Sequence, residues 1–204
     1  PTNVISITDG QIFLQSDLFN ANQRPAIDVG ISVSRVGGAA QVKAMKKVAG
    51  TLKIGLAQYR DMEAFAMFAS DLDAASRRQL DRGARLVELL RQPQYSPYPV
   101  AEQVISVWAG TTGEFDSVPV NELLGFEREF LDHLRHNTKV LETIAQTGDF
   151  DADTQQATKD ALAQFRTQWV SGGGESLVSG DQAAEAMADE DMDHEQIVVN
   201  RKRS

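Results

Sequence analysis

Apolar residues recur every three or four positions through most of the chain, the pattern of helices that bury one face. The first stripe, from Val42 to Phe65, belongs to a segment that begins at Gly38, and it predicts one helix of about thirty residues from there. Ser70-Asp71 marks a break and a new helix cap, and Pro93 ends the helix that follows. Three more helices are expected near residues 100–109, near residues 120–146 with an end at Gly148, and after a cap at Asp153.

The opening of the chain follows a different pattern, with alternating apolar and polar residues. Residues 4–14 predict two short strands around a Gly turn. After Pro25, the residues Ile27, Val29, Ile31 and Val33 alternate with polar or small residues, which predicts a strand with one buried face. Because two or three strands are marginally stable alone, we expect them to belong to a larger domain whose remainder precedes residue 1.

The predicted fold class is therefore mainly α. Residues 1–38 are expected to be strands from the end of an α/β nucleotide-binding domain, and residues 39–171 an α-helical bundle. Residues 172–204 form a third, acidic segment with eight acidic and three basic residues. Its triple glycine and low apolar content predict a flexible tail. The apolar tip 197–199 and the basic residues after it suit docking as an added strand, and a purely solubilising tail is the alternative.

Composition excludes several classes of protein. The 204 residues contain 42% hydrophobic residues, enough for an ordinary core, and no Cys for a disulfide, thiolate metal site or thiol nucleophile. A net charge of -9 argues against nucleic-acid binding. No apolar run approaches the length of a membrane span, and no signal peptide is recognisable at the start. We expect a soluble globular unit.

Arg35 follows the alternating strand and precedes Gly37-Gly38, where a helix starts. An arginine at a strand end is often a solvated charge, yet a planar guanidinium held there can also stabilise phosphate. The glycine pair is best interpreted as a tight turn, because no phosphate-binding loop motif occurs in the sequence.

Other polar residues have simpler interpretations. Gln92-Pro93-Gln94-Tyr95-Ser96-Pro97 is typical of a turn. His133 and His136 lie among charged residues on a predicted helix, so we interpret them as a solvated face and not as a metal pair. Asp71 and Asp73 suit helix capping. Trp108 and Trp169 are interpreted as core anchors.

Three segments, in order, resemble the alpha subunit family of the F-type ATP synthase: Val-Ile-Ser-Ile-Thr-Asp-Gly-Gln, Ser-Val-Ser-Arg-Val-Gly-Gly and Gln-x-Gln-Tyr-Ser-Pro. The resemblance covers residues 1 to about 171 and extends to a C-terminal extension of the actinobacterial type. It implies that Arg35 is an arginine finger acting on the catalytic site of an adjacent beta subunit. It also implies that Arg24, Pro25, Gln92 and Gln94 line the adenine pocket of a non-catalytic ATP site. Ser6 matches a serine near the catalytic interface, and a locally bonded strand hydroxyl is its equal alternative.

The family further implies a rotary, proton-translocating enzyme that synthesises or hydrolyses ATP, in which this segment alone is inactive. Its cofactors would be ATP or ADP with Mg2+ bound by residues outside this chain, and we expect no metal ligands here. The implied partners are the beta subunit, the gamma central stalk, and delta with the peripheral stalk through a preceding region. The implied place is the cytoplasmic face of the bacterial plasma membrane, with membrane contact only through the whole complex. A related hexameric export or termination ATPase and a stand-alone helical adaptor are the rival interpretations.

Overall fold

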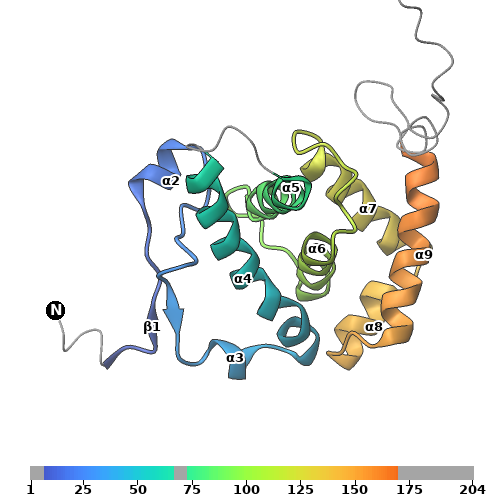
Figure 1. The fold of residues 1–204 in the computed structure, drawn as a ribbon. Coiled ribbons are helices and arrows are strands. Elements are labelled where there is room, and N and C mark those ends of the chain that lie inside the picture. Colours follow the sequence, from blue (N-terminus) through green and yellow to red (C-terminus); the bar gives the residue numbers. More distant parts are fainter. Residues whose placement is uncertain (1–6, 67–72, 170–204) are drawn as a thin grey trace, which may run out of the picture.

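The computed structural model describes residues 7–66 and 73–169 of the chain. These residues are mainly helical and include one two-stranded sheet, which confirms the predicted fold class. Figure 1 shows the N-terminal segment along one side of α4, and α8 and α9 at the opposite side of the molecule. The predicted flexible tail, residues 172–204, lies outside the described residues.

The small sheet pairs β1 (Gly10–Gln11) with β2 (Val33–Ser34) in antiparallel register, Gly10 opposite Ser34. The sequence predicted a turn at Gly10 between two strands, but the structure places Gly10 within strand β1. A Cβ atom there would lie 2.1 Å from the Val33 carbonyl oxygen, so only glycine fits this pairing. Between the two strands lies α2 (Ser16–Asn20), and an isolated antiparallel bridge joins Leu14 before this helix to Ile27 after it.

The strand predicted after Pro25 is much shorter than expected, because residues 28–32 turn around Asp28. Asp28 is only 6% exposed, whereas Ile31 and Val33 are half exposed, the reverse of the predicted alternation. The Asp28 carboxylate accepts hydrogen bonds from the main-chain N–H groups of Gly30, at 2.8 Å, and Ile31, at 3.3 Å. An aspartate side chain that bonds its own backbone competes with strand pairing, and here the turn wins.

The predicted thirty-residue helix is divided into α3 (Gly37–Ala40) and α4 (Lys43–Ala66), separated at the extended residue Gln41. The following helix, α5 (Ala74–Leu89), is capped by Asp73, whose side chain accepts a hydrogen bond from Ser76 N at 2.6 Å. This confirms the capping role predicted for Asp73. Asp71 lies outside the described residues.

The rest of the bundle comprises α6 (Val100–Thr112), α7 (Leu123–Asn137), α8 (Val140–Thr147) and α9 (Ala152–Gln168). The prediction of a single helix over residues 120–146 is wrong, because Thr138 has an extended backbone and separates α7 from α8. The predicted end at Gly148 is confirmed by its left-handed φ of 64°. The cap of α9 is Asp151 and not Asp153, since Asp151 accepts a bond from Thr154 N at 2.8 Å.

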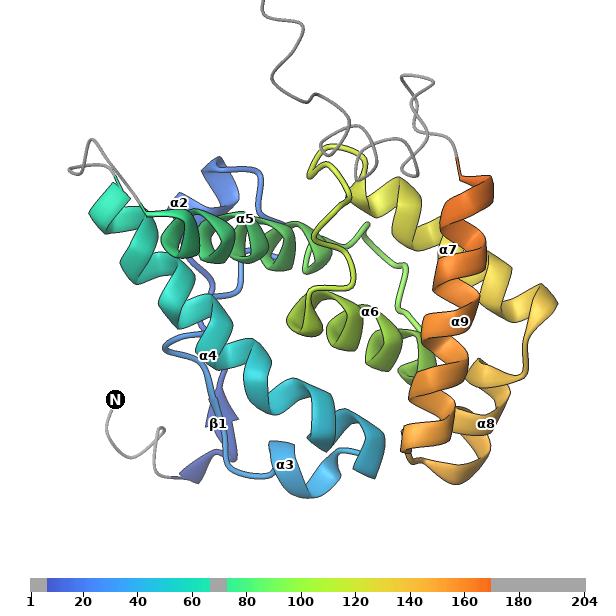
Figure 2. The same ribbon diagram turned by 45° about the vertical axis from the view of Figure 1, so that its right-hand side comes forward.

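The core lies mainly among α6, α7, α8 and α9, and it includes Ala44 and Val48 of α4. Figure 2 shows α4 and α5 on one side of α6 and α7 to α9 on the other. Phe126 contacts several aromatic rings in edge-on geometry, with ring centroids 4.9 Å from Trp169 and 5.2 Å from Phe165. Trp108 makes a similar contact with Phe150 at 5.5 Å. Both tryptophans are buried, which confirms their prediction as core anchors.

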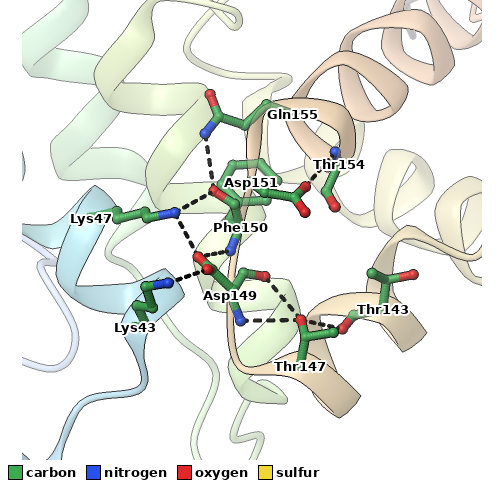
Figure 3. A network of polar contacts seen from close by, with 9 residues as sticks. All are labelled: Lys43, Lys47, Thr143, Thr147, Asp149, Phe150, Asp151, Thr154 and Gln155. Atoms are coloured by element: carbon green, nitrogen blue, oxygen red, sulfur yellow. Dashed lines mark hydrogen bonds and ion pairs between the residues drawn. The ribbon is translucent and has the colours of Figure 1, made fainter.

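One polar cluster joins the start of α4 to the turn between α8 and α9, as Figure 3 shows. Lys43 Nζ and Lys47 Nζ each lie 2.6 Å from a different carboxylate oxygen of Asp149. Lys47 Nζ also donates to the Phe150 carbonyl at 3.2 Å, which accepts a second bond from Gln155. The two ends of the bundle are therefore held together by ionic contacts as well as by the core.

Candidate functional site

A hollow of about 670 Å³ brings together two segments that lie nearly seventy positions apart. We call it the Arg24 hollow, and its lining residues are Phe19, Arg24, Pro25, Gln92, Pro93 and Gln94. The first three residues come from α2 and the chain directly after it, and the last three follow the end of α5. The four residues predicted to line a nucleotide pocket are therefore all found at one hollow.

Hydrogen bonds hold the two walls of the Arg24 hollow at a fixed spacing. The main-chain N–H of Gln92 donates to the Arg24 carbonyl at 2.9 Å. Beside this bond, the Gln23 amide donates to the Val87 carbonyl at 3.3 Å and accepts from Arg91 Nε at 3.4 Å. The chain after α2 is thus fastened to the last turn of α5, and the hollow between them is built by both elements.

The lining offers a charged group, a flat apolar surface and amides. The guanidinium carbon of Arg24 lies 4.6 Å from the centroid of the Phe19 ring, a cation–π contact that orients the side chain. Pro25 adds a flat apolar wall, and the exposed side chains of Gln92 and Gln94 provide both donors and acceptors. This combination suits a heterocycle with a polar edge, such as a nucleobase.

Phe19 is a lining residue that the sequence interpretation did not single out. The structure places Phe19 in the five-residue helix α2. The sequence signal that could have indicated Phe19 as a lining residue is its place five positions before the Arg-Pro pair, and this signal is weak. The contact with Arg24 depends on the turn between them, which the tertiary structure fixes.

Arg35 lies apart from the Arg24 hollow, because β1, the strand that pairs with β2, and α2 lie far apart in both ribbon views (Figures 1 and 2). Its side chain is exposed at the end of β2. Its main-chain N–H donates to the Asp9 carbonyl at 2.7 Å, and Ser34 Oγ accepts a bond from Gly37 N at 2.8 Å. The backbone on both sides of Arg35 is therefore fixed, so the Arg35 side chain starts from a fixed position.

Asp28 is a buried carboxylate that the sequence interpretation placed on an exposed strand face. It accepts hydrogen bonds from Arg60 Nη1 of α4 and from Gln15 Nε2, both at 2.7 Å. The Arg60 guanidinium, assisted by the Gly30 and Ile31 N–H groups, holds the pKa of Asp28 below its usual range although burial opposes this. Asp28 is thus a charged anchor between three parts of the chain.

The other predicted candidates have local roles or cannot be placed. Ser6 lies outside the described residues. A ring nitrogen of His136 lies 2.8 Å from the Asp132 carbonyl, and one of His133 lies 3.1 Å from Asn137. Within residues 7–66 and 73–169, no cluster of histidine and acidic residues has the arrangement needed to hold a metal ion. No helix in the same described ranges is both long and apolar enough to span a bilayer.

Comparison with known proteins assigns the family. Residues 41–165 match the model of the ATP synthase alpha/beta chain, C terminal domain, and residues 1–34 match that of the ATP synthase alpha/beta family, nucleotide-binding domain. The chain therefore belongs to the ATP synthase alpha/beta family.

Its relatives include the ATP synthase subunit alpha of Cutibacterium acnes, 66% identical over 202 residues, and that of Renibacterium salmoninarum, 63% identical over 203 residues. Each alignment covers 99% of this chain and 37% of the relative. The chain thus spans little more than a third of the length of these relatives.

Proposed function

We propose that this chain supplies the C-terminal part of the alpha subunit of a rotary ATP synthase. In this proposal residues 1–38 end the nucleotide-binding domain, residues 39–171 form the helical domain, and residues 172–204 form an acidic extension. The observation that carries the proposal is the Arg24 hollow, where Arg24, Pro25, Gln92 and Gln94 meet from two distant segments. The names of the relatives, all ATP synthase subunit alpha, agree with it.

The Arg24 hollow is proposed as the adenine pocket of a nucleotide site that binds ATP without turning it over. The Pro25 ring is suited to stack on a base, and the two glutamine amides can each donate to and accept from its polar edge. ATP or ADP is the expected ligand. The Mg2+ bound with it is assigned to ligands outside the chain.

Arg35 is proposed as an arginine finger that acts on the catalytic site of an adjacent beta subunit. Negative charge spreads over the oxygens of the transferring phosphoryl group, and a fixed guanidinium stabilises that charge most strongly where water is excluded. Two observations support this role: the side chain is exposed, and the backbone around it is fastened to β1. The isolated chain is expected to be inactive, since the reacting phosphate is bound elsewhere.

The proposed assembly is a ring of alternating alpha and beta subunits around a gamma subunit, with a delta subunit and peripheral stalk. It belongs to the cytoplasmic face of a bacterial plasma membrane, which this chain touches only through the complex. A related hexameric ATPase or a helical adaptor would not be expected to form this ring. Mixing the full-length subunit with beta and gamma and measuring the stoichiometry of the product separates these classes.

The arginine finger is tested with Arg35→Ala and Arg35→Lys in the assembled complex. We expect Arg35→Ala to reduce kcat for ATP hydrolysis by about a thousandfold or more, with nucleotide binding largely retained. Arg35→Lys should recover only part of the loss, because lysine keeps the charge but lacks the planar fork. Near-normal turnover of Arg35→Ala would overturn the proposed role.

The adenine pocket is tested by measuring ATP affinity at the non-catalytic sites of the same complex. Gln92→Ala and Gln94→Ala should each weaken ATP binding by about five- to tenfold, the effect of one lost hydrogen bond. They should also reduce the preference for ATP over GTP, because the amides recognise the base edge. Gln79→Ala, which removes an amide from α5 away from the hollow, is the matched control. Unchanged ATP affinity and base preference in both lining variants would contradict the pocket.

The acidic extension is proposed to contact the central stalk and restrain ATP hydrolysis. The support is its sequence: an acidic stretch that ends in an apolar and basic tip. Deleting residues 172–204 from the full-length subunit should raise the hydrolysis rate and leave the synthesis rate unchanged. Equal hydrolysis rates with and without the extension would leave it a solubility role only.

A further inference from the structure

The loop that precedes Arg35 is fastened to the helical bundle at one charged residue. This segment, residues 28–34, we call the Asp28 loop. Most of its side chains are partly or fully exposed, yet the Asp28 side chain at its start is only 9% exposed. Its contact on the bundle is Arg60 of α4, whose Nη1 lies 2.7 Å from Asp28 Oδ1. An ion pair with one buried partner holds its geometry better than one between two solvated side chains.

The loop packs directly on this ion pair. A Cβ atom at Gly30 would lie 2.9 Å from Arg60 Nη1 and 3.1 Å from Asp28 Oδ1, so a side chain there would push the two groups. The Asp28 carbonyl also accepts hydrogen bonds from the backbone and hydroxyl of Ser32. In turn, Ser32 Oγ accepts from Phe13 N at 3.0 Å. Hydrogen bonds that start at Asp28 therefore fix the conformation of the loop as far as Ser32, three residues before Arg35.

The other side of the ion pair belongs to the packed helical domain. Arg60 is on α4, which buries Ala44, Val48 and Leu56 and crosses α5 at Gly83. The first turn of the same helix is held to the turn between α8 and α9 through Asp149. A displacement of the bundle relative to the N-terminal segment would therefore act on the Asp28 loop through Arg60.

We infer that the Arg60–Asp28 pair couples helix α4 to the position of the Arg35 guanidinium. Asp28 and Arg60 are positioning residues, because they act through the loop and do not contact the reacting phosphate. This inference rests on the proposed finger role of Arg35. It adds a mechanical route by which movement of the helical domain changes catalysis on the neighbouring subunit.

The first test is Arg60→Ala in the full-length subunit, assembled with beta and gamma. This change removes the connection to α4, while Asp28 keeps its hydrogen bonds to Gln15 and to the loop itself. We expect kcat for ATP hydrolysis to fall by about ten- to a hundredfold while KM changes by less than about threefold, the pattern of a misplaced transition-state contact. Lys46→Ala, which removes an exposed cation from the same helix, is the control and should keep the wild-type kcat.

Rescue variants distinguish positioning from folding. Arg60→Lys should recover most of the lost kcat, because the ion pair uses a single nitrogen of the guanidinium. In Asp28→Asn/Arg60→Ala the unpaired buried charge is removed, so stability recovers, and we expect kcat to stay as low as in Arg60→Ala. A wild-type kcat in this double variant would overturn the inference, since the loss in Arg60→Ala would then come from the buried charge.

Combining Arg60→Ala with Arg35→Ala separates the inference from the proposal beneath it. If Arg60 acts through Arg35, the double variant should have the same kcat as Arg35→Ala alone. A further fall would show that Arg60 acts by another route and would overturn the coupling. A wild-type kcat for Arg35→Ala would instead overturn the finger role. A collapsed kcat for Arg35→Ala beside a wild-type kcat for Arg60→Ala would overturn the coupling alone.

Discussion

Lys47 Nζ lies 2.6 Å from Asp149 Oδ1, a contact that joins the beginning of α4 to the turn before α9 across more than a hundred positions of sequence. Lys43 binds the other oxygen of the same carboxylate at the same distance. Asp149 Oδ1 also accepts a hydrogen bond from Phe150 N at 2.7 Å, which orients the chain so that the Phe150 ring enters the core. The ionic contact therefore fixes the direction in which the last helix leaves the turn.

Replacing Asp149 by Asn should destabilise the chain, and the effect should depend on pH. The two lysines, Lys43 first, hold the pKa of Asp149 well below its usual range. A lowered pKa contributes stability that is complete above the unfolded pKa of about 3.9 and is lost as the pH falls through the folded value. Denaturant unfolding of the full chain should show a smaller acid-induced loss for Asp149→Asn than for the wild type.

Two controls accompany the Asp149 measurement. Asp153→Asn removes an exposed carboxylate four positions later, and it should leave the pH dependence close to that of the wild type. High salt should reduce the difference between wild type and Asp149→Asn, because both lysine side chains reach solvent, at 71% and 42% exposed, and their charges are screened. A difference that is equal at pH 3 and pH 7 would show that Asp149 acts through its shape and not its charge.

Replacing Glu127 by Gln should change the pH dependence in the opposite sense. Glu127 is 2% exposed, and within the described residues its Oε1 has no hydrogen-bond partner. Burial raises the pKa of Glu127, with a further contribution from Glu102, while a hydrogen bond from Ser106 opposes the rise. The protonated form is favoured in the folded state, so this contribution to stability is complete at low pH and lost as the pH rises through the folded pKa.

We therefore expect Glu127→Gln to retain its stability as the pH rises from 5 to 8, whereas the wild type loses stability over the same range. Unfolding curves at both pH values measure this difference. Glu129→Gln changes an exposed position on the same helix, and it should lose the same stability as the wild type between pH 5 and pH 8. Parallel losses in the wild type and Glu127→Gln would mean that the Glu127 carboxyl is not the titrating group.

Gly83 should be intolerant of alanine although it lies inside a helix. A Cβ atom there would lie 2.3 Å from Tyr59 Cδ2, because α4 and α5 cross at this point. We expect Gly83→Ala to lower the free energy of unfolding by about 1–3 kcal/mol through overpacking. Gly50 is the matched control: a Cβ atom there meets nothing within 4 Å, so Gly50→Ala should stabilise α4 by about 0.5–1 kcal/mol. Stabilisation by both changes would show that the crossing can open without cost.

Much of the helical bundle could be predicted from its own periodicity. The apolar stripes, such as the one that begins near Val42, depend on neighbours three and four positions away, so they can be recognised without the tertiary structure. The helix ends are not fixed by periodicity, because nearby residues compete to cap them. Asp151 and Asp153 both suit the start of α9, and in the structure Asp151 caps it, directly after the buried Phe150.

The candidate site, too, was only partly predictable from the sequence. Arg24, Pro25, Gln92 and Gln94 were identified by resemblance to a family, and the sequence contains no physical signal that the two segments meet. The buried state of Asp28 was missed, because alternation predicts a polar residue between Ile27 and Val29 to be solvated. Its partner Arg60 lies 32 positions further along the chain, beyond the reach of any local pattern.

By itself, the sequence determined that residues beyond Gly38 form a helical bundle, which tryptophans are core anchors and which family the chain resembles, since these depend on local periodicity and motif. The tertiary structure alone decided that α4 is connected to the Asp28 loop, that α7 and α8 are separate, and that Phe19 lies beside Arg24. The physical reason is that a buried charge or a close crossing is stable only with its partner in place. Partners distant in sequence are brought together only by folding.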